Sequence, residues 1–220
     1  MDKFIKKSID IYKEVTLIIV CYNSEKLIQQ NLTELQKFAT IIVDNSKSNK
    51  LFNLVKNFSN INYIKTNSNI GYGKANNLGV KNATTPFVMI LNPDIIINSE
   101  AIKILWEKYS QYNDVGALAP SLYDMNNKRR TNGTNSRLKK NISKIKNFES
   151  KNLAQGDTCY EFVVGCSLFM SKIFFNKIGG FDEDFFMYFE DNDLCDRIYK
   201  NGKIIIETPE SKMIHMQGLS

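Results

Sequence analysis

Apolar residues in the first half of the chain alternate between short continuous runs and stretches with helical spacing. The continuous runs predict four strands: Val15–Cys21, Thr40–Val43, Ile61–Lys65 and Phe87–Leu91. The helically spaced stretches predict four helices: Glu25–Phe38, Leu51–Phe58, Gly71–Ala83 and a helix that begins at Ser99. Strands that alternate with helices form right-handed βαβ units. The pattern therefore predicts an α/β fold with a mostly parallel central sheet flanked by helices.

The second half of the chain has a weaker periodic signal. Residues 122–159 are polar and basic, which predicts a long loop region. After it the pattern predicts a strand, a short helix and a last strand: Glu161–Met170, Asp191–Lys200 and Lys203–Glu207. We expect an N-terminal extension over residues 1–14, whose apolar residues suit a short helix. The rest is expected to form one domain in two halves, residues 15–120 and 121–220, with the basic loop at about 124–158.

Composition limits the class of protein. The 220 residues suit one domain, and 43% hydrophobic and 24% charged residues are typical of a soluble globular protein. Four scattered cysteines without a CxxC pair, together with a single histidine, favour free thiols in a reducing compartment over a zinc site. Neither a signal peptide nor an apolar run of about 20 residues is visible, so we expect a cytoplasmic protein.

Much of the net charge of +6 lies in one Asn- and Ser-rich stretch between Lys128 and Lys146. A solvated loop explains these charges about as well as contact with an anionic membrane surface or a lipid-diphosphate acceptor. Nucleic acid is the least favoured partner, and we expect none. Peripheral contact with the inner face of the plasma membrane stays open.

Polar residues follow three of the predicted strands directly. Asn23, Asp44 and Asp94 each come just after a strand, and in a parallel sheet such positions meet at the edge where ligands bind. The Asp44 carboxylate could accept a hydrogen bond from the imide N–H of uracil or thymine, or close an Asx turn. Asp94 could hold a hard cation against two phosphates, with Asn92 on ribose or a metal-bound water. A plain turn at Asn92-Pro93-Asp94 explains the same residues.

Two further stretches carry candidate chemistry. Gly71 opens a GxGxxN sequence, in which glycines before a helix let backbone N–H groups approach a diphosphate, although an ordinary loop-to-helix turn also fits. The acidic cluster at Glu190 and Asp191 follows a run of aromatic residues, which suggests a sugar-binding wall beside a general base. Helix capping by Asp191 is the alternative. His215 follows the last predicted strand, which could return it to the sheet edge that holds Asp94.

The order of these pieces resembles the family 2 glycosyltransferases. The stretches that carry the resemblance are VTLIIVCYN, IIVDNS, NSNIGYGKANNLG, FVMILNPD, FVVGCSLFMSK, IGGFDEDFFMYFEDNDLCDRIYKNG and IHMQG. They run from Val15 to Gly218, and the branch that looks most similar is the bacterial rhamnosyltransferase type of cell-surface polysaccharide synthesis. The resemblance implies the GT-A fold, a nucleotide-diphospho-sugar donor and a Mg or Mn ion.

The resemblance also assigns roles to individual positions. The residues expected around the nucleotide-sugar are Tyr22, Asn23, Asp44, Asn69, Gly71, Lys74, Asn77, Asn92 and Asp94. Asp94 matches the metal ligand of the DxD motif, and His215 matches a histidine often found at the metal. Asp191 matches the catalytic base, and the neighbouring Glu190 is the alternative base. From the residues alone, Gly165 either opens room for the acceptor or marks a tight bend.

The expected activity is inverting transfer of rhamnose or another hexose from a dTDP- or UDP-sugar to a glycan or lipid-linked acceptor in surface polysaccharide synthesis. Two departures bear on it: Asn92 replaces the first acid of DxD, and the chain ends five residues after His215, where relatives usually continue. These departures keep a catalytically silent nucleotide-binding protein as the principal alternative. A sugar-1-phosphate nucleotidyltransferase would need an early basic Gly-rich loop, and a nicotinamide oxidoreductase would need a glycine fingerprint at the first turn.

Overall fold

The computed structural model describes residues 10–66, 68–130, 132–135 and 155–216. Its strands are β1 (Val15–Cys21), β2 (Ala39–Asp44), β3 (Ile61–Lys65), β4 (Phe87–Leu91), β5 (Ile95–Ile96), β6 (Val115–Tyr123), β7 (Arg129–Arg130), β8 (Gly133–Thr134), β9 (Thr158–Tyr160), β10 (Phe162–Val163), β11 (Ser167–Ser171) and β12 (Ile204–His215). Its helices are the 3-10 helix η1 (Ile11–Lys13), α1 (Glu25–Leu35), α2 (Lys50–Val55), α3 (Tyr72–Asn82), α4 (Ser99–Tyr109), α6 (Lys172–Lys177) and α7 (Glu190–Lys200).

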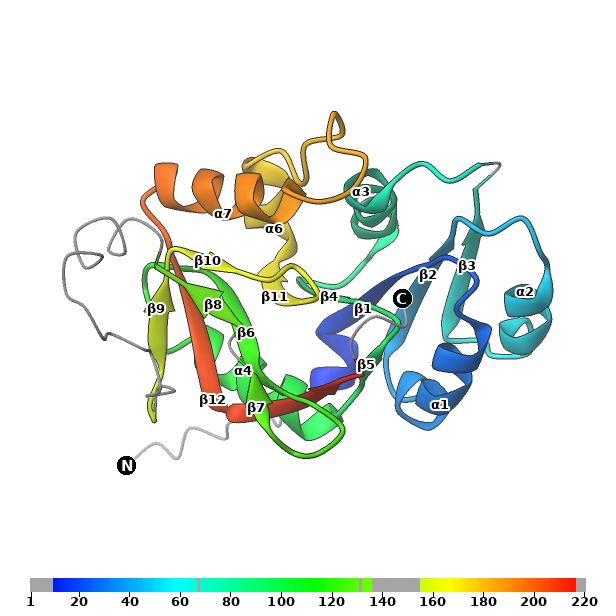
Figure 1. The fold of residues 1–220 in the computed structure, drawn as a ribbon, viewed down its shortest axis with the longest axis horizontal. Coiled ribbons are helices and arrows are strands. Elements are labelled where there is room, and N and C mark those ends of the chain that lie inside the picture. The colour runs from blue at the N-terminus through cyan, green and yellow to red at the C-terminus, as the bar shows by residue number, and fades with distance from the viewer. Residues whose placement is uncertain (1–9, 67, 131, 136–154, 217–220) are drawn as a thin grey trace, which may run out of the picture.

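The main sheet runs through both halves of the chain (Figure 1). Its strand order is β3-β2-β1-β4-β11-β6-β12-β5, with β7 paired to β6 and β9 paired to β12. Strands β3, β2, β1 and β4 are parallel to one another, and β6 is parallel to β12. Strand β11 is antiparallel to both β4 and β6, so it joins the two parallel sets into one sheet. The predicted α/β fold with a mostly parallel central sheet is confirmed.

Both faces of the sheet are covered by helices (Figure 1). Alternate side chains of β1 enter different cores, as the period-2 geometry of a strand requires. Leu17 packs in the cluster that contains Ile28 of α1 and Leu105 of α4. Ile18 packs in the cluster that contains Val80 of α3 and Leu194 of α7. The run Val15–Cys21 is buried along its length, which explains why it is apolar at all positions but Thr16 rather than alternating.

The second half of the chain differs from its prediction in three places. The predicted strand Glu161–Met170 is wrong as one element, because β10 pairs with β8 in a separate two-stranded sheet and β11 belongs to the main sheet. Strand β6 and the helix α6 were not predicted. The last strand continues beyond Glu207 to His215, with an irregularity between Thr208 and Lys212. The continuation matters because it carries His215 to the sheet edge.

The predicted basic loop is only partly a loop. Strand β7 folds back on β6, and its two arginines form ion pairs: Arg129 with Glu207 at 2.7 Å and Arg130 with Asp124 at 2.6 Å. Arg129 therefore serves the fold, and the prediction of a solvated loop is wrong for it, whereas Arg130 is paired but exposed. Lys128 is exposed as well, and the basic residues from Arg137 to Lys151 lie outside the described residues, as does most of the N-terminal extension.

The four cysteines, Cys21, Cys159, Cys166 and Cys195, are free thiols, as predicted. Within the described ranges, the helices are too short or too polar for any of them to cross a bilayer.

Candidate active site

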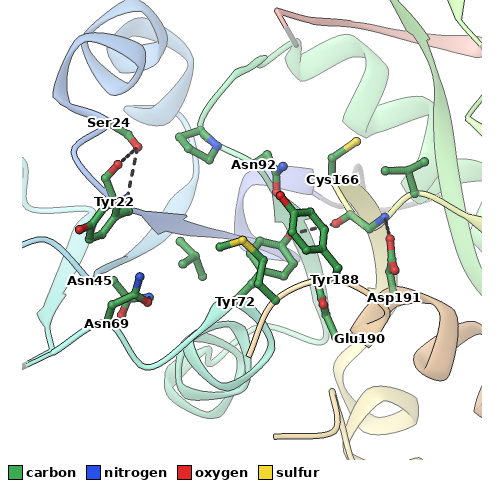
Figure 2. Close-up of a pocket in the computed structure, with 15 residues that line it drawn as sticks. Tyr22, Ser24, Asn45, Asn69, Tyr72, Asn92, Cys166, Tyr188, Glu190 and Asp191 are labelled. Carbon is green, nitrogen blue, oxygen red and sulfur yellow. Dashed lines mark hydrogen bonds between the residues drawn. The ribbon is translucent and has the colours of Figure 1, made fainter. Parts of the chain in front are cut away.

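A cavity of about 430 Å³ opens at the carboxyl ends of β1 and β4 and reaches the first turn of α7. It is lined by Val20, Tyr22, Ser24, Asn45, Asn69, Tyr72, Asn92, Pro93, Val164, Gly165, Cys166, Met187, Tyr188, Glu190 and Asp191. Figure 2 shows two groups of these residues: Tyr22, Ser24, Asn45 and Asn69 on one side, and Asn92, Cys166, Glu190 and Asp191 on the other. The strand ends thus meet at one edge of the sheet, as the sequence predicted.

The turn after β4 places Asp94 behind the cavity wall. Asn92 donates its backbone N–H to the carbonyl of Cys166 at 2.8 Å, and the turn closes with the Ile95 N–H on the Asn92 carbonyl. Asn92 and Pro93 line the cavity, whereas Asp94 is fully buried. Strand β5 follows the turn at once and pairs with β12, with His215 opposite Ile95. As a result, His215 Nε2 lies 3.3 Å from Oδ2 of Asp94.

The donor atoms at this turn suit a hard divalent cation that also binds phosphates. Asp94 offers carboxylate oxygens and His215 a ring nitrogen. The side-chain oxygen of Asn92 is buried and has no hydrogen-bond partner among the described residues. Within the same residues, no group of three or more His, Cys, Asp or Glu side chains could hold a metal ion by itself. A cation here would therefore need diphosphate and water ligands as well, which is the usual coordination of Mg²⁺ beside nucleotides.

Asp191 stands in the first turn of α7, on the opposite wall. Its Oδ2 accepts the backbone N–H of Gly165 at 3.1 Å, and its Oδ1 accepts the N–H of Asn192 at 2.9 Å. A Cβ at Gly165 would lie 2.9 Å from the Cβ of Asp191, closer than real side chains approach. Capping by Asp191 is wrong, because Phe189 is the N-cap residue and adopts a left-handed conformation. Gly165 therefore lets the backbone between β10 and β11 reach the Asp191 carboxylate.

Glu190 lies beside Asp191 in a different environment. Its side chain lines the cavity, yet the residue is only 6% exposed, and in the described part of the chain its Oε2 has no hydrogen-bond partner. Burial raises the pKa of Glu190 above its ordinary value, and the nearby Asp191 charge raises it further. The two adjacent acids therefore differ in how they are held: the Asp191 carboxylate accepts two backbone N–H groups, and it is the better oriented of the two to accept a proton.

Cys166 connects the two walls of the site. It is buried, it lines the cavity, and its carbonyl holds the Asn92 N–H. Burial raises the pKa of the Cys166 thiol to about 12, and the charges of Asp94 and Asp191 add to the rise. The backbone of Gly165-Cys166 thus lies between the two acids: Asp191 accepts the Gly165 N–H, and Cys166 accepts the N–H of Asn92, two residues before Asp94.

The residues predicted to surround the nucleoside divide between the cavity and the fold. Tyr22 and Asn69 line the cavity. Asp44 does not; it is fully buried, with Oδ1 accepting the Ser46 N–H at 2.8 Å and Oδ2 accepting the Tyr63 hydroxyl at 2.6 Å. The Ser46 contact is the hydrogen bond of an Asx turn. A base contact by Asp44 stays a prediction that the cavity lining does not support.

Asn23 is exposed and adopts a left-handed conformation with φ of 54°. Its backbone N–H donates a hydrogen bond to the Ser46 hydroxyl at 2.7 Å, and Asn23 is not part of the cavity lining. The positive φ, uncommon outside glycine, lets β1 turn sharply after Tyr22. Its predicted contact with the nucleoside stays a prediction.

The glycine-rich stretch packs mainly against the segment before α7. Gly71 has φ of 87°, and a Cβ there would lie 2.5 Å from the Phe186 carbonyl oxygen. Lys74 pairs with Glu183 at 3.3 Å, and Asn77 exchanges hydrogen bonds with the backbone of Phe181. None of the three lines the cavity. Their glycine, amide and ammonium groups position the segment that leads to Asp191, and the predicted contacts with the donor stay predictions.

Several lining residues were not assigned roles at the site from the sequence: Ser24, Asn45, Tyr72, Val164 and Cys166. Met187 and Tyr188 belong to the aromatic run that was predicted to form a sugar-binding wall. Tyr72 is the most informative, because its hydroxyl donates to the Gly165 carbonyl at 2.9 Å. Burial raises the pKa of Tyr72 well above its ordinary value, so the hydroxyl stays a donor. It lies inside the GxGxxN stretch, but nothing in that stretch indicates that its partner is 93 residues away.

The fold and the site together define a class: an α/β protein with a cavity at its strand ends, an Asp–His pair behind one wall and a carboxylate pair on the other. The chain belongs to glycosyl transferase family 2, whose model matches residues 16–175. A second model, described as the N-terminal domain of galactosyltransferase, matches residues 150–217. The predicted family is confirmed.

Three relatives illustrate the family. The low-salt glycan biosynthesis hexosyltransferase Agl10 of Haloferax volcanii is 28% identical, over 93% of this chain and 67% of its own length. The N-acetylglucosaminyl-diphospho-decaprenol L-rhamnosyltransferase of Mycobacterium tuberculosis is 25% identical, over 61% of this chain and 48% of its own length. The rhamnosyltransferase WbbL of Escherichia coli K12 is 26% identical, over 91% and 83%. The chain thus spans between about half and five sixths of these relatives.

Solved structures share the GT-A fold. The mannosyltransferase PcManGT of Pyrobaculum calidifontis, in complex with GDP-Man and Mn²⁺, aligns with a TM-score of 0.66 and 18% identity, over 94% of this chain and 58% of that one. TarS of S. aureus, in complex with UDP-GlcNAc, aligns with a TM-score of 0.65 and 19% identity, over 93% and 61%. At these identities the likeness is one of fold, and it confirms the predicted GT-A architecture.

Proposed function

We propose that this chain transfers a hexosyl group from a nucleotide-diphospho-sugar to a hydroxyl of a glycan or lipid-linked acceptor, with inversion at the anomeric carbon. The observation that carries the proposal is that Gly165-Cys166 contacts both walls of the cavity. The Gly165 N–H is donated to the Asp191 carboxylate, and the Cys166 carbonyl accepts the N–H of Asn92, two residues before Asp94. A donor held at the first wall would present its anomeric carbon toward the second.

In the proposed reaction Asp191 accepts the proton of the acceptor hydroxyl. The hydroxyl oxygen forms a bond to the anomeric carbon as the bond from that carbon to the diphosphate oxygen breaks, and the nucleoside diphosphate leaves with the electron pair. One displacement from the side opposite the leaving group inverts the configuration. The N–H groups of Gly165 and Asn192 support this role because they fix the Asp191 carboxylate on the acceptor side of the cavity.

Asp94 and His215 are the proposed protein ligands of a Mg or Mn ion, supported by the 3.3 Å approach of the two side chains. When bound, such a cation neutralises charge that develops on the departing diphosphate. Asn92 is proposed to orient ribose or a metal-bound water, supported by its position in the cavity lining and by a side-chain oxygen that has no hydrogen-bond partner among the described residues.

The substrates are proposed from the relatives. Their names include hexosyl- and rhamnosyltransferases, and one carries a polyprenyl-diphosphate acceptor in its name. We infer a dTDP- or UDP-sugar donor, with rhamnose or another hexose as the transferred group. A lipid-linked acceptor would place the protein at the inner face of the plasma membrane.

The test begins with binding. UDP-, dTDP- and GDP-sugars are titrated into the protein with Mn²⁺ by calorimetry, and the best donor is then followed by NMR during hydrolysis or transfer. We expect the product's anomeric configuration to be opposite to the donor's. Asp191→Asn should lower turnover by about 10²–10⁴-fold, the usual share of general-base catalysis, while donor affinity is retained.

Other results would count against the proposal. Retention of configuration would exclude the single displacement. Equal loss of turnover and donor affinity in Asp191→Asn would remove Asp191 from the role of base. Donor binding without any turnover would favour the catalytically silent alternative, for which Asn92 in place of an acid is the supporting observation.

A further inference from the structure

The segment just before α7 exposes four consecutive large apolar side chains. We call Phe186–Phe189 the aromatic strap. Its members are 56%, 48%, 72% and 66% exposed, in chain order. A contiguous exposed patch of this kind is unusual on a folded domain and marks a binding surface. Two members, Met187 and Tyr188, also line the catalytic cavity, so the strap is continuous with the site that holds Asp191.

The backbone of the strap is fixed at both ends. The Phe186 carbonyl accepts the Tyr72 N–H at 3.1 Å, and the Phe189 carbonyl accepts the Asp193 N–H at 3.0 Å. Gly71 makes the first contact possible, since any side chain there would collide with the Phe186 carbonyl. The strap is therefore held against α3 at one end and built into α7 at the other.

Two residues of the strap have a backbone conformation that residues other than glycine rarely adopt. Tyr188 has φ of 69° and Phe189 has φ of 71°. A left-handed conformation costs about 1–2 kcal/mol for a residue with a side chain, and it persists where surrounding contacts determine it. Here it turns the Tyr188 ring toward the cavity, where Figure 2 shows it on the side of Asn92 and Asp191. The conformation sets the direction of the backbone three residues before the proposed base, and the Tyr188 ring itself is 72% exposed.

We propose that the aromatic strap is the acceptor platform, with the Tyr188 ring packed against the face of the acceptor saccharide whose hydroxyl is presented to Asp191. This inference rests on the proposed function. The polar residues at the far side of the cavity, Tyr22, Asn45 and Asn69, suit the nucleoside. The acceptor must reach Asp191 from the other side, where the strap forms the wall.

The chemistry of a sugar ring matches this wall. A pyranose presents C–H groups on its faces and hydroxyls at its edge, so it can pack flat on an aromatic ring while one hydroxyl points at a carboxylate. Aromatic rings supply large contact area with few rotatable bonds, so little side-chain entropy is lost on binding. A lipid chain would also contact the exposed aromatic side chains, but it would not need to enter the cavity that two members of the strap line. The structure therefore favours the saccharide as the group that binds at this wall.

The experiment compares acceptors that differ only in their aglycone. The acceptors are the methyl and octyl glycosides of N-acetylglucosamine, galactose and rhamnose, each used with the donor that calorimetry identifies. Hydrolysis of the donor, in which water is the acceptor, is measured in parallel. The variants are Tyr188→Ala, the ring-retaining Tyr188→Phe, and Ile173→Ala as a control. Ile173 is 79% exposed in α6 and lies outside the cavity lining, so it tests the loss of an exposed apolar side chain as such. Circular dichroism verifies that each variant is folded.

We expect Tyr188→Ala to raise KM about tenfold for the methyl and the octyl glycoside alike, which corresponds to about 1.4 kcal/mol. The KM of the donor should change much less, Tyr188→Phe should restore acceptor binding, and Ile173→Ala should behave as wild type. A loss confined to octyl glycosides would assign the strap to the lipid and overturn the saccharide platform. So would an equal rise in donor KM, or no rise at all.

Failure of this inference is distinguishable from failure of the proposed function. If no nucleotide-sugar is bound or hydrolysed by the wild-type protein, the proposed function itself is wrong. If the donor is hydrolysed but none of the glycosides is an acceptor, the transferase chemistry stands and the saccharide platform is refuted.

Discussion

The contact between Gly165 and Asp191 allows a sharp test of how the base is positioned. The backbone of Gly165 does not have a positive φ, so alanine is compatible with its conformation. The added Cβ would nevertheless lie 2.9 Å from the Asp191 Cβ, whereas ordinary contacts begin at 3.4 Å. In Gly165→Ala the two segments must therefore separate by about 0.5 Å, and the 3.1 Å hydrogen bond from the Gly165 N–H to Oδ2 is lengthened or lost.

The magnitude follows from the displacement of the carboxylate. A misplacement of about 1 Å at a reacting group can cost about 10²-fold in rate. A shift of about 0.5 Å should therefore lower kcat roughly tenfold. The overpacking also lowers the free energy of unfolding, by about 1–3 kcal/mol. Donor affinity should change less, because Tyr22 and Asn69 line the side of the cavity away from this contact.

The assay measures kcat, donor KM and thermal stability for Gly165→Ala and for a matched control, Gly156→Ala. Gly156 is exposed, and a Cβ there would meet no atom within 4 Å. The control should leave all three quantities at their wild-type values. The reasoning is refuted if Gly165→Ala keeps the wild-type kcat, or if donor KM rises by the same factor as kcat falls.

Three further predictions concern the rest of the site. His215→Ala should raise the Mn²⁺ concentration for half-maximal activity by at least about tenfold, because it removes a nitrogen donor 3.3 Å from Asp94. The measurement is turnover as a function of Mn²⁺ concentration, and an unchanged Mn²⁺ requirement would exclude His215 as a ligand. At pH 8 the melting temperature of Glu190→Gln should be higher than that of the wild type. This difference should disappear as the pH is lowered toward 4.5. The sign follows from the raised pKa of Glu190: its protonated form is favoured by folding, so stability is lost as pH rises through the folded-state pKa. A variant with the wild-type pH profile would contradict this. Gly71→Ala should lower the free energy of unfolding by about 2 kcal/mol or more in urea denaturation, since it combines a left-handed backbone with a collision at the Phe186 carbonyl; an effect as small as that of Gly156→Ala would show that the strap tolerates displacement.

The elements of the first half could be predicted because their signals are local. Strand β1 is apolar along its whole length since both faces are covered, and α4 repeats its apolar residues at helical spacing. Strand β6 was missed for the opposite reason. Its sequence VGALAPSLY is rich in small residues and contains Pro120, so its propensity for a strand is weak. It is a strand because β11 and β12 flank it and bury it.

The candidate site shows the same division. The positions of Asn92 and Asp94 after a strand, and of Asp191 beside a run of aromatics, are visible in the sequence. The pairing of Asp94 with His215 depends on β12 continuing through a polar stretch to meet β5, which no local pattern indicates. Likewise, the sequence does not show that Glu190 and Asp191 have different environments, because these adjacent acids are distinguished by burial and backbone contacts.

The sequence by itself determined the α/β class, the family and the identity of the acids, because periodicity and motif order are properties of the chain alone. The tertiary structure decided which acid is held by backbone N–H groups, which residues predicted to contact the donor also make contacts within the fold, and where the aromatic strap lies. These depend on contacts between segments far apart in the chain and on backbone conformations such as that of Tyr188, and neither leaves a local signature in the order of residues.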